Sequence, residues 1–410
     1  MNDKSVLREL AKRYLEATCD PIYEERRALW SKKNNLKKTR PMVIASFGIW
    51  NVWCREVFGE HALKCQDPFF RRHEQTLRMQ LFQHEVGDDQ VLEPWITQRA
   101  TLTSRGWDDI WGVHTGHVDS GVIGGAWKYD PPLKTWDDMN KLRVPHHGVD
   151  EADTRHNIER LHEVVGDILP INLDRSPDCL GFLSDISTTL CKLRGLEQLM
   201  IDMYDSPEEL HQLLAFMCDG VLTNQTEAEA AGDVNLFSAH SQEPFYCETL
   251  EPLKPNDGPR KLKELWGFAA AQEFTVISPE MHEEFMLRYQ LPILSRFALT
   301  SYGCCENLTR KIDMLRAIPN LRLIAVAPTA DVTKCAEQIR DDYVLSWRPN
   351  PTDMVCCGWD EQRIRRIIRE GLAATKDCHL AIHLKDIETV QGDPTRLRRW
   401  VELVRSEIGE

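Results

Sequence analysis

The sequence predicts an α/β protein built as a single (β/α)8 TIM barrel with an N-terminal helical extension. From about residue 95 onward, short apolar strands alternate with amphipathic helices, which is the pattern of parallel βα units. Six or more such units in one chain favour a barrel over an open sheet. No Gly/Ser-rich or Pro-rich linker divides the 410 residues. We therefore expect an extension over residues 1–90 and one barrel over residues 91–410.

The extension is expected to be mostly helical. Apolar residues recur at helical spacing in residues 5–17 and 67–86, and residues 21–38 continue as a charged helix. Residues 40–48 interrupt this pattern with a β-branched run that ends in glycine, which is typical of a strand.

The barrel elements follow in order along the rest of the chain. The helix of residues 278–297 has Ser278 as its expected N-cap and Pro279 at its first position. The other predicted helices are residues 195–232 (as two helices), 307–318, 330–342, 360–376 and 393–408. The predicted strands are residues 166–174, 233–240, 297–302, 321–328, 343–347 and 379–384.

Composition limits the classes of function. The hydrophobic content of 42% and the charged content of 28% are typical of a soluble globular protein. The net charge of −14 disfavours nucleic acid as a partner. The N-terminal segment is charged throughout, unlike a signal peptide, and no apolar run is long enough for a membrane helix. Thirteen cysteines without a secretion signal indicate a reducing compartment, so we expect a cytoplasmic protein.

Polar side chains follow several predicted strands at the point where each strand ends. In a barrel, the active site lies at the carboxyl ends of the strands. The stretch at residues 302–306 follows one strand, and those at 241–243, 348–351 and 385–388 follow three others. We therefore expect these segments to converge on one face, together with the loop at residues 269–274.

Four longer stretches resemble the uroporphyrinogen decarboxylase superfamily, namely residues 131–142, 195–214, 276–294 and 330–354. The similarity spans roughly residues 130–408 and is distributed rather than concentrated in one motif. The resemblance implies a (β/α)8 barrel. The superfamily holds both the porphyrinogen decarboxylase and cobalamin-linked methyltransferases.

Two motifs of that superfamily are altered in this chain. The decarboxylase carries an arginine-rich RQAGR loop that holds substrate carboxylates, whereas residues 46–59 here contain a single arginine, Arg55. Decarboxylation of a porphyrinogen with many carboxylates is therefore not expected. The methyltransferases that act on thiols carry a His-x-Cys zinc motif where this chain has Tyr302-Gly303-Cys304.

The adjacent cysteines are candidate ligands for zinc. Zinc takes thiolate, imidazole and carboxylate ligands. Cys304 and Cys305 supply two thiols, Glu306 follows them directly, and Glu273 and His240 stand at neighbouring strand exits. The alternative is a pair of reactive or buried thiols without a metal.

The candidate catalytic residues are Glu273, Tyr302, Glu306 and Asp386. A carboxylate in the loop that holds Glu273 can exchange a proton or orient a substrate, although a solvated loop acid is the alternative. Asp386 follows a predicted strand, where it either enters the barrel mouth or forms an ion pair with Lys385 at the rim.

The candidate substrate-binding residues are His240, Glu243, Gln272 and Trp107. The first two follow the predicted strand at 233–240, and Gln272 precedes Glu273 in the loop after an apolar run. Trp107 belongs to an aromatic segment that either walls a pocket or packs in the core.

The leading interpretation, which rests on the resemblance, is a methyltransferase or O-demethylase. It moves a methyl group from a small methylated substrate to the cobalt of a separate corrinoid protein, because we recognise no cobalamin-binding segment in the chain. Breaking an ether requires that the leaving oxygen be protonated or bound to a Lewis acid. The alternatives are a decarboxylase of a small carboxylic acid and a non-catalytic ligand-binding barrel. No nucleic-acid or membrane partner is expected, and a homodimer is considered.

Overall fold

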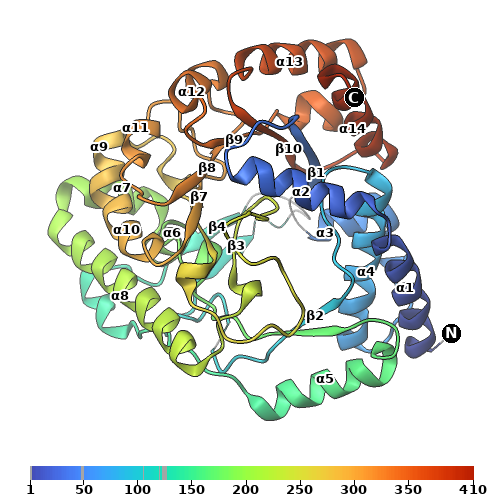
Figure 1. Cartoon of the computed structure of the whole chain (residues 1–410). Helices are drawn as coiled ribbons and strands as arrows, with labels where there is room; N and C mark the ends of the chain where they lie inside the picture. Colours follow the sequence, from blue (N-terminus) through green and yellow to red (C-terminus); the bar gives the residue numbers. More distant parts are fainter. Residues whose placement is uncertain (1, 48–49, 105, 120, 122–126) are drawn as a thin grey trace.

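The central feature of the computed structural model, which describes residues 2–47, 50–104, 106–119, 121 and 127–410, is a curled parallel sheet. Its strands are β1 (Met42–Phe47), β6 (Trp266–Ala269), β7 (Leu299–Tyr302), β8 (Leu321–Val326), β9 (Val344–Trp347) and β10 (His379–Ile387). They lie in the order β1-β10-β9-β8-β7-β6, and every neighbouring pair is parallel. Figure 1 shows the helices arranged around the outside of the strands.

Four further strands lie outside this sheet. β2 (Ile96–Arg99) pairs in parallel with β5 (Ile171–Asp174), and β3 (Gly116–Asp119) pairs with β4 (Trp127–Asp130) as an antiparallel hairpin. In the described part of the chain, no strand ladder joins β2 and β5 to the six-stranded sheet. The structure therefore confirms a parallel α/β fold with a curled sheet, whereas a closed (β/α)8 TIM barrel is not formed by these ladders.

The prediction of a strand at residues 233–240 was wrong. This segment contains a single 3₁₀ turn, Leu236–Ser238, instead. The side chain of Asn235 accepts a hydrogen bond from the backbone N–H of Phe237, so a local turn replaces ladder pairing there. The segment still lies beside β6, because the N–H of His240 donates to the carbonyl of Trp266 at 2.9 Å.

The helices cover the outer face of the sheet and the ends of the strands. They are α1 (Asp3–Thr18), α2 (Ile22–Asn34), α3 (Trp50–Trp53), α4 (Pro68–Val86), α5 (Glu151–Val165), α6 (Ser187–Arg194), α7 (Leu196–Asp205), α8 (Pro207–Ala231), α9 (Pro279–His282), α10 (Arg288–Leu294), α11 (Ile312–Leu315), α12 (Val332–Ile339), α13 (Glu361–Ala374) and α14 (Thr395–Ile408).

The predicted helix at residues 278–297 begins as expected but is not continuous. The side chain of Ser278 caps α9 by accepting the N–H of Met281 at 3.3 Å. A π turn at Glu283–Leu287 then separates α9 from α10, and α10 contains Pro292. Proline has no N–H to donate within a helix, which is a common reason for such irregular turns.

The first 90 residues are largely helical, as predicted, but they also complete the sheet. β1 pairs with β10 from Met42 opposite Ala381 to Phe47 opposite Ile387. α2 lies at the amino-terminal end of these strands, where the Lys33 ammonium donates to the carbonyl of Leu380. The N-terminal segment is thus part of the same structure, and the boundary at residue 90 stays a prediction.

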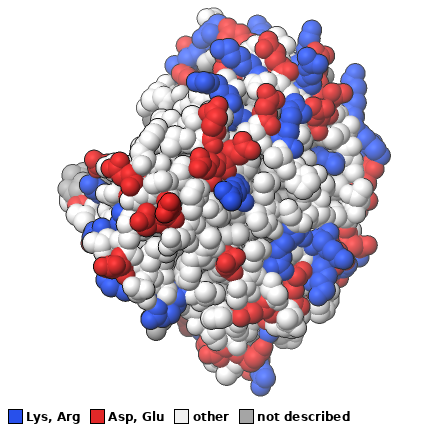
Figure 2. Space-filling view, turned by 90° about the vertical axis from the view of Figure 1, so that its left-hand side faces the viewer, with Lys and Arg blue, Asp and Glu red and all other residues white. Residues whose placement is uncertain are grey.

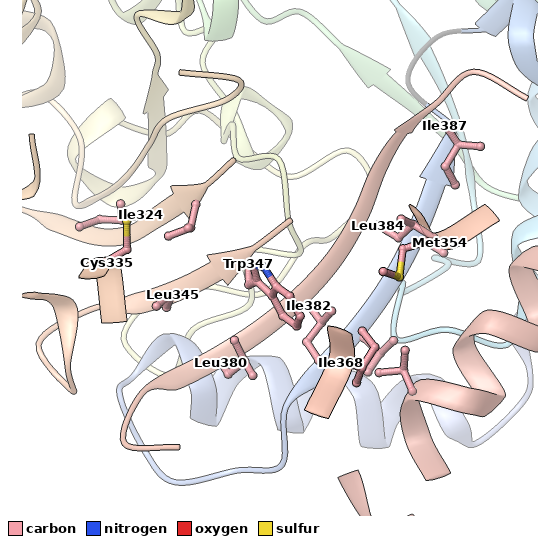
Figure 3. Close-up of a cluster of buried hydrophobic side chains, with 14 of the residues drawn as sticks. Ile324, Cys335, Leu345, Trp347, Met354, Ile368, Leu380, Ile382, Leu384 and Ile387 are labelled. Carbon is pink, nitrogen blue, oxygen red and sulfur yellow. The ribbon is translucent and has the colours of Figure 1, made fainter. Parts of the chain in front are cut away.

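The largest apolar core lies between the sheet and helices α12, α13 and α14. Ile324, Leu345 and Ile382 project from β8, β9 and β10 and are fully buried there (Figure 3). The indole ring of Trp347 packs directly against Gly371 of α13. There is no room between them for a Cβ atom at position 371. This packing fixes the positions of the strands whose carboxyl ends carry the polar residues.

Among the described residues, no helix combines the length and apolar character needed to cross a bilayer. On the face shown in Figure 2, basic and acidic side chains are interspersed. This face therefore lacks the continuous basic surface that nucleic-acid binding favours.

Ile382→Ala tests the packing of β10. We expect a loss of about 2–5 kcal/mol in the free energy of unfolding, because the substitution leaves a cavity in a fully buried position between two strands. Urea denaturation provides the measurement. Ile408→Ala, at a partly buried position near the end of α14, is the control and should lose less. Equal losses would contradict the central position of β10 in the core.

Candidate functional site

The loops that follow β6, β7 and β9 meet the carboxyl-terminal part of β10 at one edge of the sheet, as the sequence predicted. Glu306, which is fully buried, accepts the N–H of Ala271 and the N–H of Cys304, each at 2.8 Å. Arg348, directly after β9, donates from Nη1 to the carbonyl of Cys304 at 2.5 Å. Lys385, near the end of β10, reaches the Cys304 sulfur. These contacts join the loops into one polar site.

Gly303 turns the chain from β7 into the site. Its φ of +101° is strained for other residues, and a Cβ atom there would lie 2.9 Å from Leu308 and 3.3 Å from Ala325. The turn brings Cys304 against Phe268 on the neighbouring strand, together with Ala270 and Phe182. Cys304 therefore has an apolar wall on one side and polar groups on the other.

The two adjacent thiols differ in their surroundings. Cys304 is buried and Cys305 is exposed, and their Sγ atoms are 3.5 Å apart. The Lys385 Nζ lies 3.4 Å from the Cys304 Sγ and 3.0 Å from Asp386 Oδ2. A hydrogen bond from Cys305 and the charges of Lys385 and Arg348 lower the pKa of Cys304, and the same hydrogen bond raises the pKa of Cys305. Of the two thiols, Cys304 therefore ionises more readily than Cys305.

The donor set does not fit the zinc site considered from the sequence. Within the described ranges, no group of three or more His, Cys, Asp and Glu side chains is arranged to hold a metal ion. Both oxygens of Glu306 bind backbone N–H groups, and an ammonium occupies the space beside Cys304. The two thiols therefore lack the third protein ligand that zinc sites provide.

A buried carboxylic acid, Asp185, completes the site. Gln290 donates to the carbonyls of both Asp185 and Ala270, at 2.6 and 2.8 Å, so Asp185 lies beside the loop after β6. Burial, followed by repulsion from Glu273, raises the pKa of Asp185 well above its ordinary value of 3.8. Its Oδ1 accepts the N–H of Thr188 at 3.3 Å, whereas Oδ2 has no partner in the described part of the chain. Asp185 is therefore a buried acid with a raised pKa and with one carboxyl oxygen that has no partner among the described residues.

A second buried polar group lies deeper among the strands. Glu243 accepts a hydrogen bond from Ser346 on β9, and its Oε1 lies 3.7 Å from Nδ1 of His383 on β10. The other ring nitrogen of His383 lies 3.1 Å from the hydroxyl of Ser46 on β1. Burial lowers the pKa of His383. A neutral imidazole is thus held between Glu243 and Ser46.

The other predicted catalytic residues have well-defined positions. Glu273 is half-buried and accepts the hydroxyl of Ser187 at 2.5 Å. Tyr302 is fully buried, and its hydroxyl lies 2.9 Å from both His282 and Gln290, on the helical side of the sheet. Asp386 forms the rim ion pair with Lys385 and lies 3.9 Å from the Cys305 Sγ.

The predicted substrate-binding residues fall into two groups. His240 and Gln272 lie at the site: the His240 ring is 5.8 Å from the Phe268 ring, and Gln272 hydrogen-bonds Thr188 and Glu273. Trp107 is 43% exposed, with the ammonium of Lys192 5.0 Å from its ring centre, so it packs neither in the core nor against Cys304.

Three residues of the site escaped the sequence analysis. His383 is two positions before Lys385 on β10, and this two-residue spacing could have indicated a shared strand face. Arg348 lies in a predicted strand-exit segment, but nothing local marked it as buried. Asp185 precedes α6 and carries no signal in the sequence, because only the folded chain brings it to Ala270.

Comparisons with known proteins give a similarity of fold. No family model and no curated protein matches the sequence. Among solved structures, the fold is similar to that of a methyltransferase from Methanosarcina mazei, with a TM-score of 0.50 and 14% sequence identity. The alignment covers 93% of this chain and 97% of that chain. At this identity the likeness concerns the fold alone.

Asp185→Asn should stabilise the protein more as the pH rises. The folded state holds the Asp185 proton more tightly than the unfolded state, so this group's contribution to stability falls as the pH rises above about 3.8. The asparagine variant lacks this loss, and its advantage should be larger at about pH 8 than at about pH 5. Urea denaturation of both proteins at the two pH values measures the difference. Asp377→Asn, at an exposed position, is the control, and a pH-independent difference for Asp185→Asn would contradict the raised pKa.

Proposed function

We propose that the protein is an enzyme that removes a methyl group from a small O-methylated substrate and passes it to the cobalt of a corrinoid protein. The observation that carries this proposal is the buried Asp185, which has a raised pKa and an unpartnered Oδ2 among the described residues, beside the polar strand-exit site. The similarity of fold to a methyltransferase and the resemblance of four stretches to the superfamily with cobalamin-linked methyltransferases are consistent with it.

The chemistry requires a proton at the leaving oxygen. When the C–O bond breaks, its electron pair stays on oxygen, and an unprotonated alkoxide or phenoxide is a poor leaving group. Asp185 supplies the proton in this proposal, since burial and the neighbouring Glu273 raise its pKa and so favour its protonated form. The free Oδ2 of Asp185 is the atom through which it would donate. Glu273 therefore acts on the reaction through Asp185.

The substrate is expected to bind along the apolar wall of the site. Phe182 and Phe268 meet edge to face with their ring centres 5.0 Å apart, and the ring of His240 lies 5.8 Å from that of Phe268. Burial lowers the pKa of His240, so its ring is neutral there. Such a surface suits the uncharged part of a methoxylated molecule. The corrinoid is brought by a partner protein, and a cytoplasmic location and a homodimer remain part of the proposal.

The assay is the formation of methylcobalamin from cob(I)alamin and a panel of methoxylated aromatic compounds, followed by absorbance. Asp185→Asn should lower the rate by about 10²-fold or more, because a general acid is lost while the size of the side chain is kept. Cys356→Ser, in the second pair of adjacent cysteines, is the matched control and should keep the wild-type rate. Equal rates for wild type and Asp185→Asn would contradict the role of the acid.

The second candidate is a decarboxylase of a small carboxylic acid. The observation that favours it is Arg348, which is buried and whose Nε and Nη2 have no partner among the described residues. A guanidinium with free N–H groups is suited to a carboxylate.

Uroporphyrinogen itself should not be converted to coproporphyrinogen. Its many carboxylates need several cationic partners, and an arginine-rich loop is missing from residues 46–59. Chromatography of the oxidised porphyrins after incubation gives the readout. Turnover of this substrate would rank the decarboxylase above the methyltransferase.

A further inference from the structure

Cys304 differs from the other cysteines in what surrounds its sulfur. In the part of the chain that the structure describes, it is the one thiol that receives a hydrogen bond from an ammonium, that of Lys385 at 3.4 Å. The Sγ of Cys305 lies 3.5 Å from the Cys304 Sγ, within hydrogen-bond distance. A sulfur surrounded by such donors is stabilised as a thiolate, which is the nucleophilic form of cysteine.

The other side of Cys304 is apolar. Cys304 forms a buried cluster with Phe268 and Ala270, Phe182 packs against this cluster, and Cys304 is 4% exposed. An apolar contact suits a methyl group and excludes water from the sulfur. The turn at Gly303 holds the sulfur between this wall and Lys385, so the two environments meet at one atom.

We propose that Cys304 is a catalytic nucleophile that takes the methyl group onto its own sulfur and then gives it to the corrinoid. This inference rests on the proposed methyltransferase function. It assigns to Cys304 a covalent role in place of the metal-ligand role considered from the sequence.

The two steps balance in atoms and electrons. In the first, the thiolate attacks the methyl carbon: the S–C bond forms, the C–O bond breaks, and the oxygen keeps the electron pair and takes the proton of Asp185. In the second, Co(I) of the corrinoid attacks the same carbon: the Co–C bond forms, the cobalt becomes formally Co(III), and the sulfur keeps the pair of the broken S–C bond. The departing thiolate is again stabilised by Lys385 and Cys305.

The contact between Lys385 and Cys304 explains why this site needs neither a zinc ion nor a third protein ligand for it. A metal ion would hold the sulfur as a thiolate by its positive charge. The Lys385 ammonium supplies a positive charge at the same sulfur, and Asp386 holds the ammonium at 3.0 Å. Lys385 and Asp386 are thus positioning residues for Cys304.

The first experiment is methylation of the folded protein with one equivalent of ¹³C-methyl iodide, followed by peptide mapping. Cys304 should be methylated before Cys19 and Cys357, although both of these are exposed. Lys385→Met should slow this methylation by about tenfold, because one charge-assisted contact is lost, and Lys385→Arg should restore most of the rate. Labelling of Cys19 or Cys357 with Cys304 unmodified would overturn the proposal, and this comparison needs no variant.

The second experiment adds cob(I)alamin to the labelled protein. The ¹³C-methyl group should leave Cys304 and appear in methylcobalamin, as seen by NMR. A methyl group that stays on Cys304 would overturn the relay. The proposed function fails separately: if Cys304→Ser still forms methylcobalamin from a methoxylated substrate at the wild-type rate, the function stands and the relay is wrong.

Discussion

The candidate site depends on one buried carboxylate, Glu306. Its two oxygens bind the backbone N–H groups of Ala271 and Cys304, which belong to the loops after β6 and β7. A buried N–H group that is left without its acceptor costs roughly 1–3 kcal/mol. The same two contacts set the path of the backbone at Cys304 and bring Ala271 beside it. The sequence suggested a catalytic acid at this position, but both oxygens are engaged in holding the loops.

Two carboxyl groups of equal burial therefore have different roles in this site. Asp185 and Glu306 are both fully buried, yet one oxygen of Asp185 is free and Glu306 binds N–H groups through both. Burial beside another acid favours the protonated form of a carboxyl group, and this is why the pKa of Asp185 is raised. The hydrogen-bond partners distinguish the two carboxyl groups, and a sequence does not record them.

The sequence predicts the positions of most strands and helices, but it does not predict which side chains contact one another. The strands at residues 297–302, 321–328 and 343–347 are apolar runs bounded by turns, and the structure has β7, β8 and β9 there. Residues 233–240 have a similar apolar character, but Asn235 forms a local turn that the periodicity does not reveal. β2, β3 and β4 are short and partly exposed, so they lack a strong apolar signal.

The same distinction applies to the site. The convergence of the strand-exit segments follows from parallel strands, because their carboxyl ends lie at one edge, and this was predictable. Asp185 was not predictable, since its place beside Ala270 depends on Gln290 of α10 bonding both carbonyls. The burial of Arg348 likewise depends on the carbonyl of Cys304, which the Gly303 turn places next to it. Single contacts between distant segments decide these positions.

The turn at Gly303 separates the two flanking side chains of the Tyr302-Gly303-Cys304 motif. In a regular strand, residues two apart point to the same face. Here the φ of +101° at Gly303 breaks this alternation. Tyr302 packs in the core on the helical side of the sheet and bonds His282, while Cys304 packs against Phe268 on the other side. A histidine in place of Tyr302 would point toward the helices and away from the thiol. Lys385 is the positively charged partner of Cys304 because the backbone turns at Gly303, and not because position 302 lacks a histidine.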